Sequence, residues 1–178
     1  SKRNNPFANS GFVVNVELED MQPFENAGAL KGVMLQKSVE YNAWIAGGKT
    51  QAAPAQRMVD FTMGKCSNSL PVCSYKPGIV SENLNQILPP FISESLRSAF
   101  KQIAIKRAAY FTNEAVLVAP ESRTSSPVRI PRDTITLQHT QVSGLYPCGE
   151  GAGYAGGIIS AAMDGMRVAH KIAELHLV

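Results

Sequence analysis

The sequence has few charged residues and no long run of basic or apolar residues. Charged residues make up 17% of the 178 positions, a fraction that argues against a disordered chain. No stretch rich in lysine and arginine is interleaved with aromatic residues, so we expect no nucleic-acid partner. No apolar run approaches the roughly 20 residues that span a bilayer, and Ser1–Asn5 lacks the apolar segment of a signal peptide. We therefore expect a cytoplasmic protein without membrane association.

Cysteine and histidine are also scarce. Cys66, Cys73 and Cys148 are odd in number and widely spaced, which does not suggest a disulfide framework. A cytoplasmic location predicts that Cys66 and Cys73 are reduced thiols. Cys148 directly precedes a glycine-rich stretch and is either a redox-active thiol or a small packed residue; the absence of a C-x-x-C pair favours packing. The three histidines show no metal-ligand spacing, and we predict no metal site.

The chain does contain enough apolar residues, 44%, to build a core. Apolar residues three or four positions apart predict helices at 26–46, 91–108 and 156–175. Short β-branched or apolar runs predict strands at 11–18, 115–119, 126–130, 134–140 and 144–150. The segment 57–63 fits either a strand or a helical turn, and 49–90 is otherwise irregular and proline-rich. The mixture predicts an α/β fold class.

The last predicted helix has a stripe of mostly small side chains. The stripe consists of Ile158, Ala162, Met166, Ala169 and Ala173. Small residues on one face permit close approach, so we expect this face to pack on a sheet. Asp164 lies in the middle of the same helix, before Gly165, and we assign it no chemistry.

The glycine-rich stretch Gly151–Gly156 reads G-x-G-x-x-G, the pattern of a dinucleotide-binding loop. A nicotinamide loop needs a second parallel strand after its helix, and the residues after Gly157 suffice only for a helix. We therefore expect a strand-to-helix turn with Tyr154 at its outer bend. Two interpretations stay open: a tight turn with glycines for packing and Glu150 in solvent, or a turn whose backbone and Glu150 bind anions and hydroxyls.

A second stretch, 121–133, concentrates arginines and hydroxyls. It contains Arg123, Thr124, Ser125, Ser126, Arg129 and Arg132. One interpretation is a clamp for an anionic substrate or a cofactor phosphate. The candidate residues for that clamp are Arg123, Ser125, Ser126 and Arg129. The other interpretation is a strand hairpin with solvated arginines, one of them paired to Asp133.

Three stretches resemble the C-terminal part of a family of bacterial FAD-dependent proteins, usually labelled NAD(FAD)-utilising dehydrogenases or FAD-dependent oxidoreductases. They are NPFANSGFVV (5–14), ESRTSSPVRIPRD (121–133) and GLYPCGEGAGYAGGIISAAMDG (144–165). APAQRMVDF and LPVCSYKPGI also fit, so the resemblance covers nearly the whole chain. It implies that the FAD-binding βαβ unit lies in an N-terminal segment outside this chain, and it leaves NAD(P) open as an electron partner.

The resemblance also implies a cofactor site at the glycine-rich stretch. The implied cofactor-binding residues are Gly149, Glu150, Gly151, Ala152, Gly153, Gly156, Gly157 and Ile158. Glu150 would bind ribityl or pyrophosphate-side hydroxyls of FAD. The backbone of Gly156–Ile158 would face the flavin's pyrimidine edge with the positive end of the helix dipole.

By the same resemblance, residues 1–20 and 127–178 are parts of a Rossmann-like FAD-binding domain, and 21–126 form an inserted, partly helical, substrate-facing domain. The expected function is that of the C-terminal portion of a FAD-dependent oxidoreductase or dehydrogenase whose substrate the sequence does not identify. Alone, the chain is expected to be inactive and to bind FAD weakly or not at all. The alternative is a non-enzymatic binding or interaction module with a glycine-rich turn and no cofactor.

Overall fold

A computed structural model describes residues 4–176 of the chain. The fold is mixed α/β and divides into two compact units. The first unit comprises Ser1–Pro23 and Lys37–Ser122, and the second comprises Phe24–Gln36 and Arg123–Val178. The boundary falls within helix α1 (Lys31–Ala46), so both units include part of that helix.

The first unit is built around a three-stranded sheet with the order β2-β1-β3. The strands are β1 (Ala53–Arg57), β2 (Ile79–Ser81) and β3 (Val116–Val118). The central strand β1 pairs parallel to β2 and antiparallel to β3, with Ala55 opposite Ser81 on one side and Val118 on the other. β3 confirms the strand predicted at 115–119. β1 and β2 were not predicted, because both are short and β1 contains Pro54 and Gln56.

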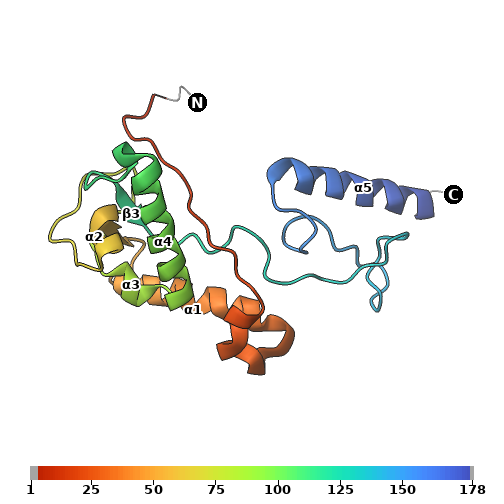
Figure 1. Cartoon of the computed structure of the whole chain (residues 1–178). Coiled ribbons are helices and arrows are strands. Elements are labelled where there is room, and N and C mark those ends of the chain that lie inside the picture. The colour runs from red at the N-terminus through yellow and green to blue at the C-terminus, as the bar shows by residue number, and fades with distance from the viewer. Residues whose placement is uncertain (1–3, 177–178) are drawn as a thin grey trace. The chain divides into compact units, whose positions relative to one another are not determined.

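Helices pack against this sheet and against one another. They are α2 (Met58–Met63), α3 (Leu84–Ile87), α4 (Pro90–Lys106) and the 3-10 turn η2 (Ala108–Tyr110). Both α2 and α3 contact α4 and β1 (Figure 1). Phe61 of α2 and Phe100 of α4 are fully buried and meet edge to face, with ring centroids 6.0 Å apart. α4 confirms the helix predicted at 91–108, and α2 shows that 57–63 is mainly helical, ending at the left-handed Gly64.

The predicted strand at 11–18 is wrong. Within the described residues this segment pairs with no strand, and the 3-10 segment η1 (Glu19–Leu30) follows it. The segment is attached to the first unit by Phe12, whose ring lies 5.0 Å from that of Phe100. The predicted helix at 26–46 starts late, at Lys31, because the non-helical backbone of Gly28, at φ +55°, interrupts the preceding turns.

The second unit contains a long irregular segment and the helix α5 (Ile158–His176), which confirms the predicted closing helix. The strands predicted at 126–130, 134–140 and 144–150 do not form; turns and bends occupy this part of the described chain. Pro127, Pro131 and Pro147 remove backbone donors there. The Asp133 carboxylate accepts hydrogen bonds from the N–H groups of Ile135 and Thr136, which closes a local turn instead of a ladder.

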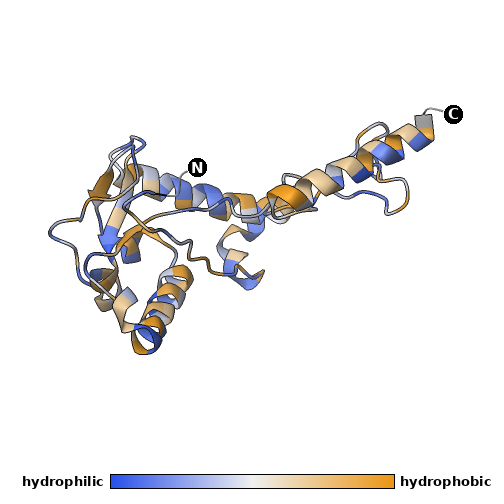
Figure 2. Cartoon of the chain, turned by 90° about the horizontal axis from the view of Figure 1, so that it is seen from above, coloured by the Kyte–Doolittle hydropathy of each residue, from blue (hydrophilic) through white to orange (hydrophobic). Residues whose placement is uncertain are grey.

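Helix α5 is amphipathic, and its ribbon carries residues of both hydrophobic and hydrophilic character (Figure 2). Val168 is buried. Ile158, Ala162, Met166 and Ala169 of the predicted stripe are exposed, with Ile158 89% exposed. No strand forms in the described part of the second unit, so this unit has no sheet of its own to cover that face. None of the described helices is both long enough and apolar enough to cross a membrane.

Candidate functional site

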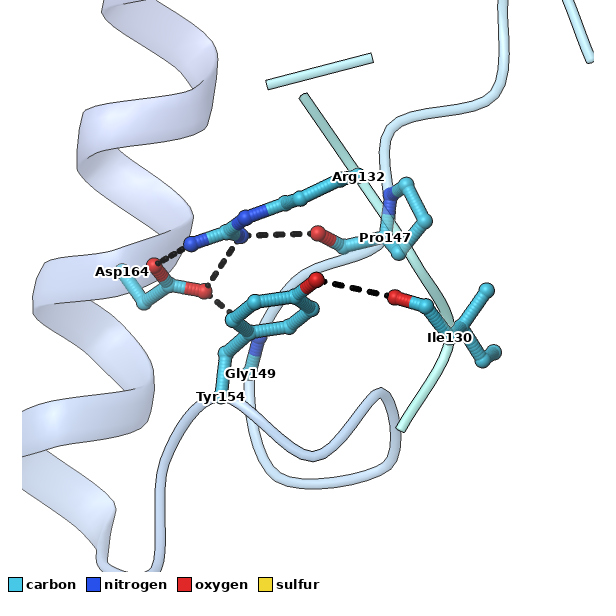
Figure 3. A network of polar contacts seen from close by, with 6 residues as sticks. All are labelled: Ile130, Arg132, Pro147, Gly149, Tyr154 and Asp164. Atoms are coloured by element: carbon cyan, nitrogen blue, oxygen red, sulfur yellow. Dashed lines mark hydrogen bonds and ion pairs between the residues drawn. The ribbon is translucent and has the colours of Figure 1, made fainter. Parts of the chain in front are cut away.

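A buried ion pair connects the irregular segment of the second unit to α5. Arg132 Nη2 lies 2.7 Å from Asp164 Oδ1, and Arg132 Nη1 donates to Asp164 Oδ2 at 2.9 Å (Figure 3). The two side chains are only 6% and 11% exposed. Arg132 Nη1 also donates to the backbone oxygen of Pro147 at 2.8 Å. This fork is the bidentate geometry that arginine makes with a carboxylate.

The hydrogen bond from Arg132 holds the pKa of Asp164 below its ordinary value, despite partial burial. A second donor is the backbone N–H of Gly149, 2.9 Å from Asp164 Oδ2. Asp164 is therefore a carboxylate that accepts from a guanidinium and a backbone amide. Burying an unpaired charge is costly, so each member of this group depends on the others.

Tyr154 completes the group. Its ring lies 3.6 Å from the guanidinium carbon of Arg132 and 4.4 Å from that of Arg129. Its hydroxyl donates to the backbone oxygen of Ile130 at 2.9 Å (Figure 3). The prediction that Tyr154 lies at the outer bend of the turn is wrong. Its cation–π contacts and its hydroxyl hydrogen bond hold its side chain against the 129–132 segment.

The glycine-rich stretch is a tight turn held by two internal backbone hydrogen bonds. The N–H of Tyr154 donates to the oxygen of Gly149 at 3.0 Å, and the N–H of Gly153 donates to the oxygen of Glu150 at 2.9 Å. Gly149 and Gly153 have positive φ, +71° and +82°, a conformation that glycine adopts without strain. The prediction of a strand-to-helix turn is confirmed in part. The glycine turn is followed by a helix, as predicted, but the residues before the turn do not form a strand.

The turn packs directly on the arginine-rich stretch. The N–H of Ile130 donates to the oxygen of the buried Ala152 at 3.1 Å. A β-carbon on Gly153 would lie 2.6 Å from the oxygen of Val128, so only glycine permits this approach. Ser126 Oγ bonds the oxygen of Val128 at 2.8 Å and that of Gly151 at 3.3 Å.

The structure therefore brings only some of the predicted anion-binding residues to the turn. Ser126 and Arg129 lie beside it through the contacts above. Ser125 instead accepts a hydrogen bond on its backbone oxygen from Gln36 at 3.4 Å. The alternative in which an arginine pairs with Asp133 is wrong: within the described residues the Asp133 carboxylate accepts only from Ile135 and Thr136, and Arg132 pairs with Asp164.

The outer side of the turn presents groups that can bind a ligand. The Glu150 carboxylate is exposed and has no hydrogen-bond partner within the described chain. At Gly151 and Gly156 an added β-carbon would meet nothing within 4 Å, so a ligand can approach the backbone there. The first intrahelical bond of α5 joins the N–H of Ala161 to the oxygen of Gly157 at 2.9 Å. The preceding N–H groups, including that of Ile158, have no intrahelical acceptor.

Two further residues differ from expectation. Cys148 is exposed, not packed as favoured, because its neighbour Pro147 takes the buried position in this segment. Asp164 was assigned no chemistry, yet it is the centre of the polar group. The signal that could have found it is an acidic residue on a helix otherwise suited to apolar packing, together with three arginines upstream.

Two comparisons with known proteins bear on the chain. The sequence model of a family described as "FAD-dependent protein, C-terminal domain-like" matches residues 1–124, which include the whole of the first unit and residues 24–36 of the second. An uncharacterized protein of Clostridium beijerinckii (strain ATCC 51743 / NCIMB 8052) is 40% identical over 169 residues, a region that covers 94% of this chain and 31% of that protein. The chain thus spans about a third of the length of this relative.

Proposed function

The chain belongs to the C-terminal domain-like family of FAD-dependent proteins, and from this premise we propose that it forms the C-terminal portion of a FAD-dependent oxidoreductase. The observation that carries the proposal is the turn at Gly149–Tyr154. It carries the exposed Glu150 carboxylate next to Gly149, whose added β-carbon would lie 3.9 Å from that of Ala161 in the first turn of α5. When bound, FAD supplies hydride or electron transfer, while the protein binds, orients and tunes it.

The outer side of this turn fits FAD. Glu150 accepts hydrogen bonds from ribityl or pyrophosphate-side hydroxyls, which its free carboxylate permits. The N–H groups of Gly156, Gly157 and Ile158 would bind the pyrimidine edge of the flavin. They lie at the positive end of the dipole of a 19-residue helix, which favours negative charge on the reduced ring.

The remaining predicted cofactor residues shape the turn. Gly151 keeps the backbone open to the ligand. Gly149 and Gly153 provide the positive φ angles, and Ala152 and Gly153 provide the contact with the 128–130 segment. Of the arginine-rich stretch, Arg129 is the best-placed anion contact, since it is exposed beside Tyr154. Ser126 supports it through its bond to the backbone oxygen of Gly151 in the turn.

We propose that the partner of this chain is an N-terminal FAD-binding segment of the same protein. The relative extends well beyond the matched region, which is 31% of its length. The exposed apolar side chains of α5 suit burial against such a segment. They include Ile158, Ile159, Met163 and Met166. In this proposal 1–20 and 127–178 contribute to the FAD-binding domain and 21–126 to a substrate-facing domain, and the contact of Phe12 with Phe100 links 1–20 to the latter.

The competing function is an interaction module that binds no cofactor, and the same exposed apolar side chains of α5 favour it. FAD titration distinguishes the two. We expect the full-length protein that carries this sequence to bind FAD, the present chain alone to bind it weakly or not at all, and Glu150→Gln to weaken binding by about 1–3 kcal/mol in the full-length protein. A matched control is Glu121→Gln, an exposed carboxylate outside the turn. Full-length protein without flavin, and with no flavin uptake on titration, would show that the cofactor assignment is wrong.

A further inference from the structure

Asp164 and Arg132 attach both ends of the glycine turn to the body of α5. The beginning of the turn is attached through the N–H of Gly149, which donates to Asp164 Oδ2 at 2.9 Å. Its end is attached through the ring of Tyr154, 3.6 Å from the guanidinium carbon of Arg132. The two attachments meet at one ion pair, so a change at Asp164 reaches both ends of the turn.

Asp164 lies six positions after the first residue of α5, Ile158, so it is set well behind the helix N-terminus. The contact between Gly149 and Asp164 therefore fixes the position of the turn relative to the first N–H groups of α5. The turn also lies close to the first turn of the helix, because a β-carbon built on Gly149 would lie 3.9 Å from that of Ala161.

From these contacts we propose that Asp164, acting through Arg132 and the N–H of Gly149, is the positioning residue of the FAD site. This inference rests on the FAD binding proposed above. Asp164 itself faces the guanidinium and the backbone of the turn, not the exposed side that carries Glu150. It sets the distance and orientation between the Glu150 carboxylate and the N–H groups that begin α5, two sets of groups that must meet one ligand together.

Two substitutions test the proposed positioning role, and each keeps a different property of the original side chain. Asp164→Asn keeps the shape of the side chain but replaces one acceptor oxygen with a donor that faces Arg132. Arg132→Lys keeps the charge and loses the planar fork that reaches Asp164 and Pro147 at once. Glu174→Gln is the matched control on the same helix, because it removes only the exposed ion pair with Lys171.

The first measurement uses the present chain and needs no FAD. In ¹H–¹⁵N spectra we expect the Gly149 amide, which donates to a carboxylate, to move upfield in Asp164→Asn and Arg132→Lys and to stay in place in Glu174→Gln. A Gly149 amide unchanged in folded Asp164→Asn would overturn the inference.

The second measurement uses the full-length protein, well below the melting temperature of every variant. We expect Asp164→Asn and Arg132→Lys each to weaken FAD binding about tenfold or more, to change the flavin absorption spectrum, and to be non-additive in the double variant because they act through one contact. Variants with lower melting temperatures but wild-type FAD affinity and spectrum would overturn the inference, because they would show a purely structural role. Wild-type protein that binds no FAD would instead refute the proposed function, and the Gly149 amide would still report on the turn.

Discussion

The ring of Tyr154 lies against the guanidinium of Arg132, 3.6 Å from its central carbon, and the same guanidinium is bound to Asp164 by two hydrogen bonds. The three residues come from the arginine-rich stretch, the glycine turn and α5. Two stretches that the sequence presents as separate motifs are therefore parts of one structure, and the turn that carries Glu150 depends on side chains that do not face its outer side.

Removing the hydroxyl of Tyr154 tests its contribution to this structure. We expect Tyr154→Phe to cost about 0.5–1.5 kcal/mol of unfolding free energy, because the hydrogen bond to the oxygen of Ile130 is lost while the ring remains over Arg132. Tyr154→Leu should cost more, because the cation–π contact is lost too. Tyr110→Phe, at an exposed tyrosine of the first unit, is the control for urea denaturation. Equal stability of Tyr154→Phe and Tyr154→Leu would show that the ring contact contributes nothing.

The two glycines Gly153 and Gly151 should respond differently to alanine. At Gly153 the added β-carbon would lie 2.6 Å from the oxygen of Val128, and φ is +82°. We expect Gly153→Ala to destabilise the second unit by more than about 1 kcal/mol, from the left-handed conformation alone. Gly151→Ala meets nothing within 4 Å and should leave the folded chain unchanged. Thermal denaturation of both variants checks this, and equal melting temperatures would contradict it.

Acid should weaken the second unit through Asp164. Arg132 by its hydrogen bond, and Arg167 to a smaller extent, favour the charged carboxylate, so the folded pKa lies below that of an unfolded aspartate. The stabilisation is complete above about pH 4 and is lost as the pH falls through the folded pKa. We expect the stability difference between wild type and Asp164→Asn, measured by urea denaturation, to shrink over that range. For Glu174→Gln the difference should be small at every pH, because this pair is exposed. A wild-type advantage that persists at the lowest pH would contradict the assignment.

The first unit has its own buried polar residue, Gln56 of β1. Its side chain is fully buried, donates to the oxygen of Lys65 at 2.7 Å and accepts from the N–H of Leu84 at 2.9 Å. Gln56→Leu leaves both backbone groups without this partner, so we expect a loss of about 2 kcal/mol or more. Gln102→Leu, at an exposed position of α4, should change stability little. Guanidinium denaturation of the two variants makes the comparison, and equal stabilities would mean that water replaces the lost bonds.

Elements held by local patterns were predictable from the sequence. α4 and α5 show helical spacing of apolar residues, and β3 is an apolar run that lies fully inside the predicted range. The segments 11–18 and 126–150 have β-like composition, but a strand forms only where a partner strand supplies hydrogen bonds. In the described chain the first is held by Phe12, and the second by Pro147, Asp133 and the pair Arg132–Asp164.

The candidate site was predictable only in part. The glycines, Glu150 and the start of the last helix stand together in the sequence, so their proximity follows from local spacing. The partner of Arg132 does not follow from local spacing, because Asp164 is 32 positions away. The pairing considered from the sequence was that of one of the three arginines with Asp133. Asp133 is occupied by the N–H groups of Ile135 and Thr136, which leaves the arginine to the helix. Which carboxylate pairs with Arg132 depends on the path of the chain between Arg132 and Asp164, and the sequence of that segment has no periodic pattern.

The central claim is that FAD binds at the turn and the N-terminus of α5. Amide hydrogen exchange of the full-length protein, with and without FAD, tests it most directly. We expect FAD to slow exchange at Glu150, Gly151 and Gly156–Ile158, the amides with no acceptor in the described chain. Amides already bonded inside the turn, those of Gly153 and Tyr154, should change less. FAD that binds while exchange across 149–160 stays unchanged would contradict the claim.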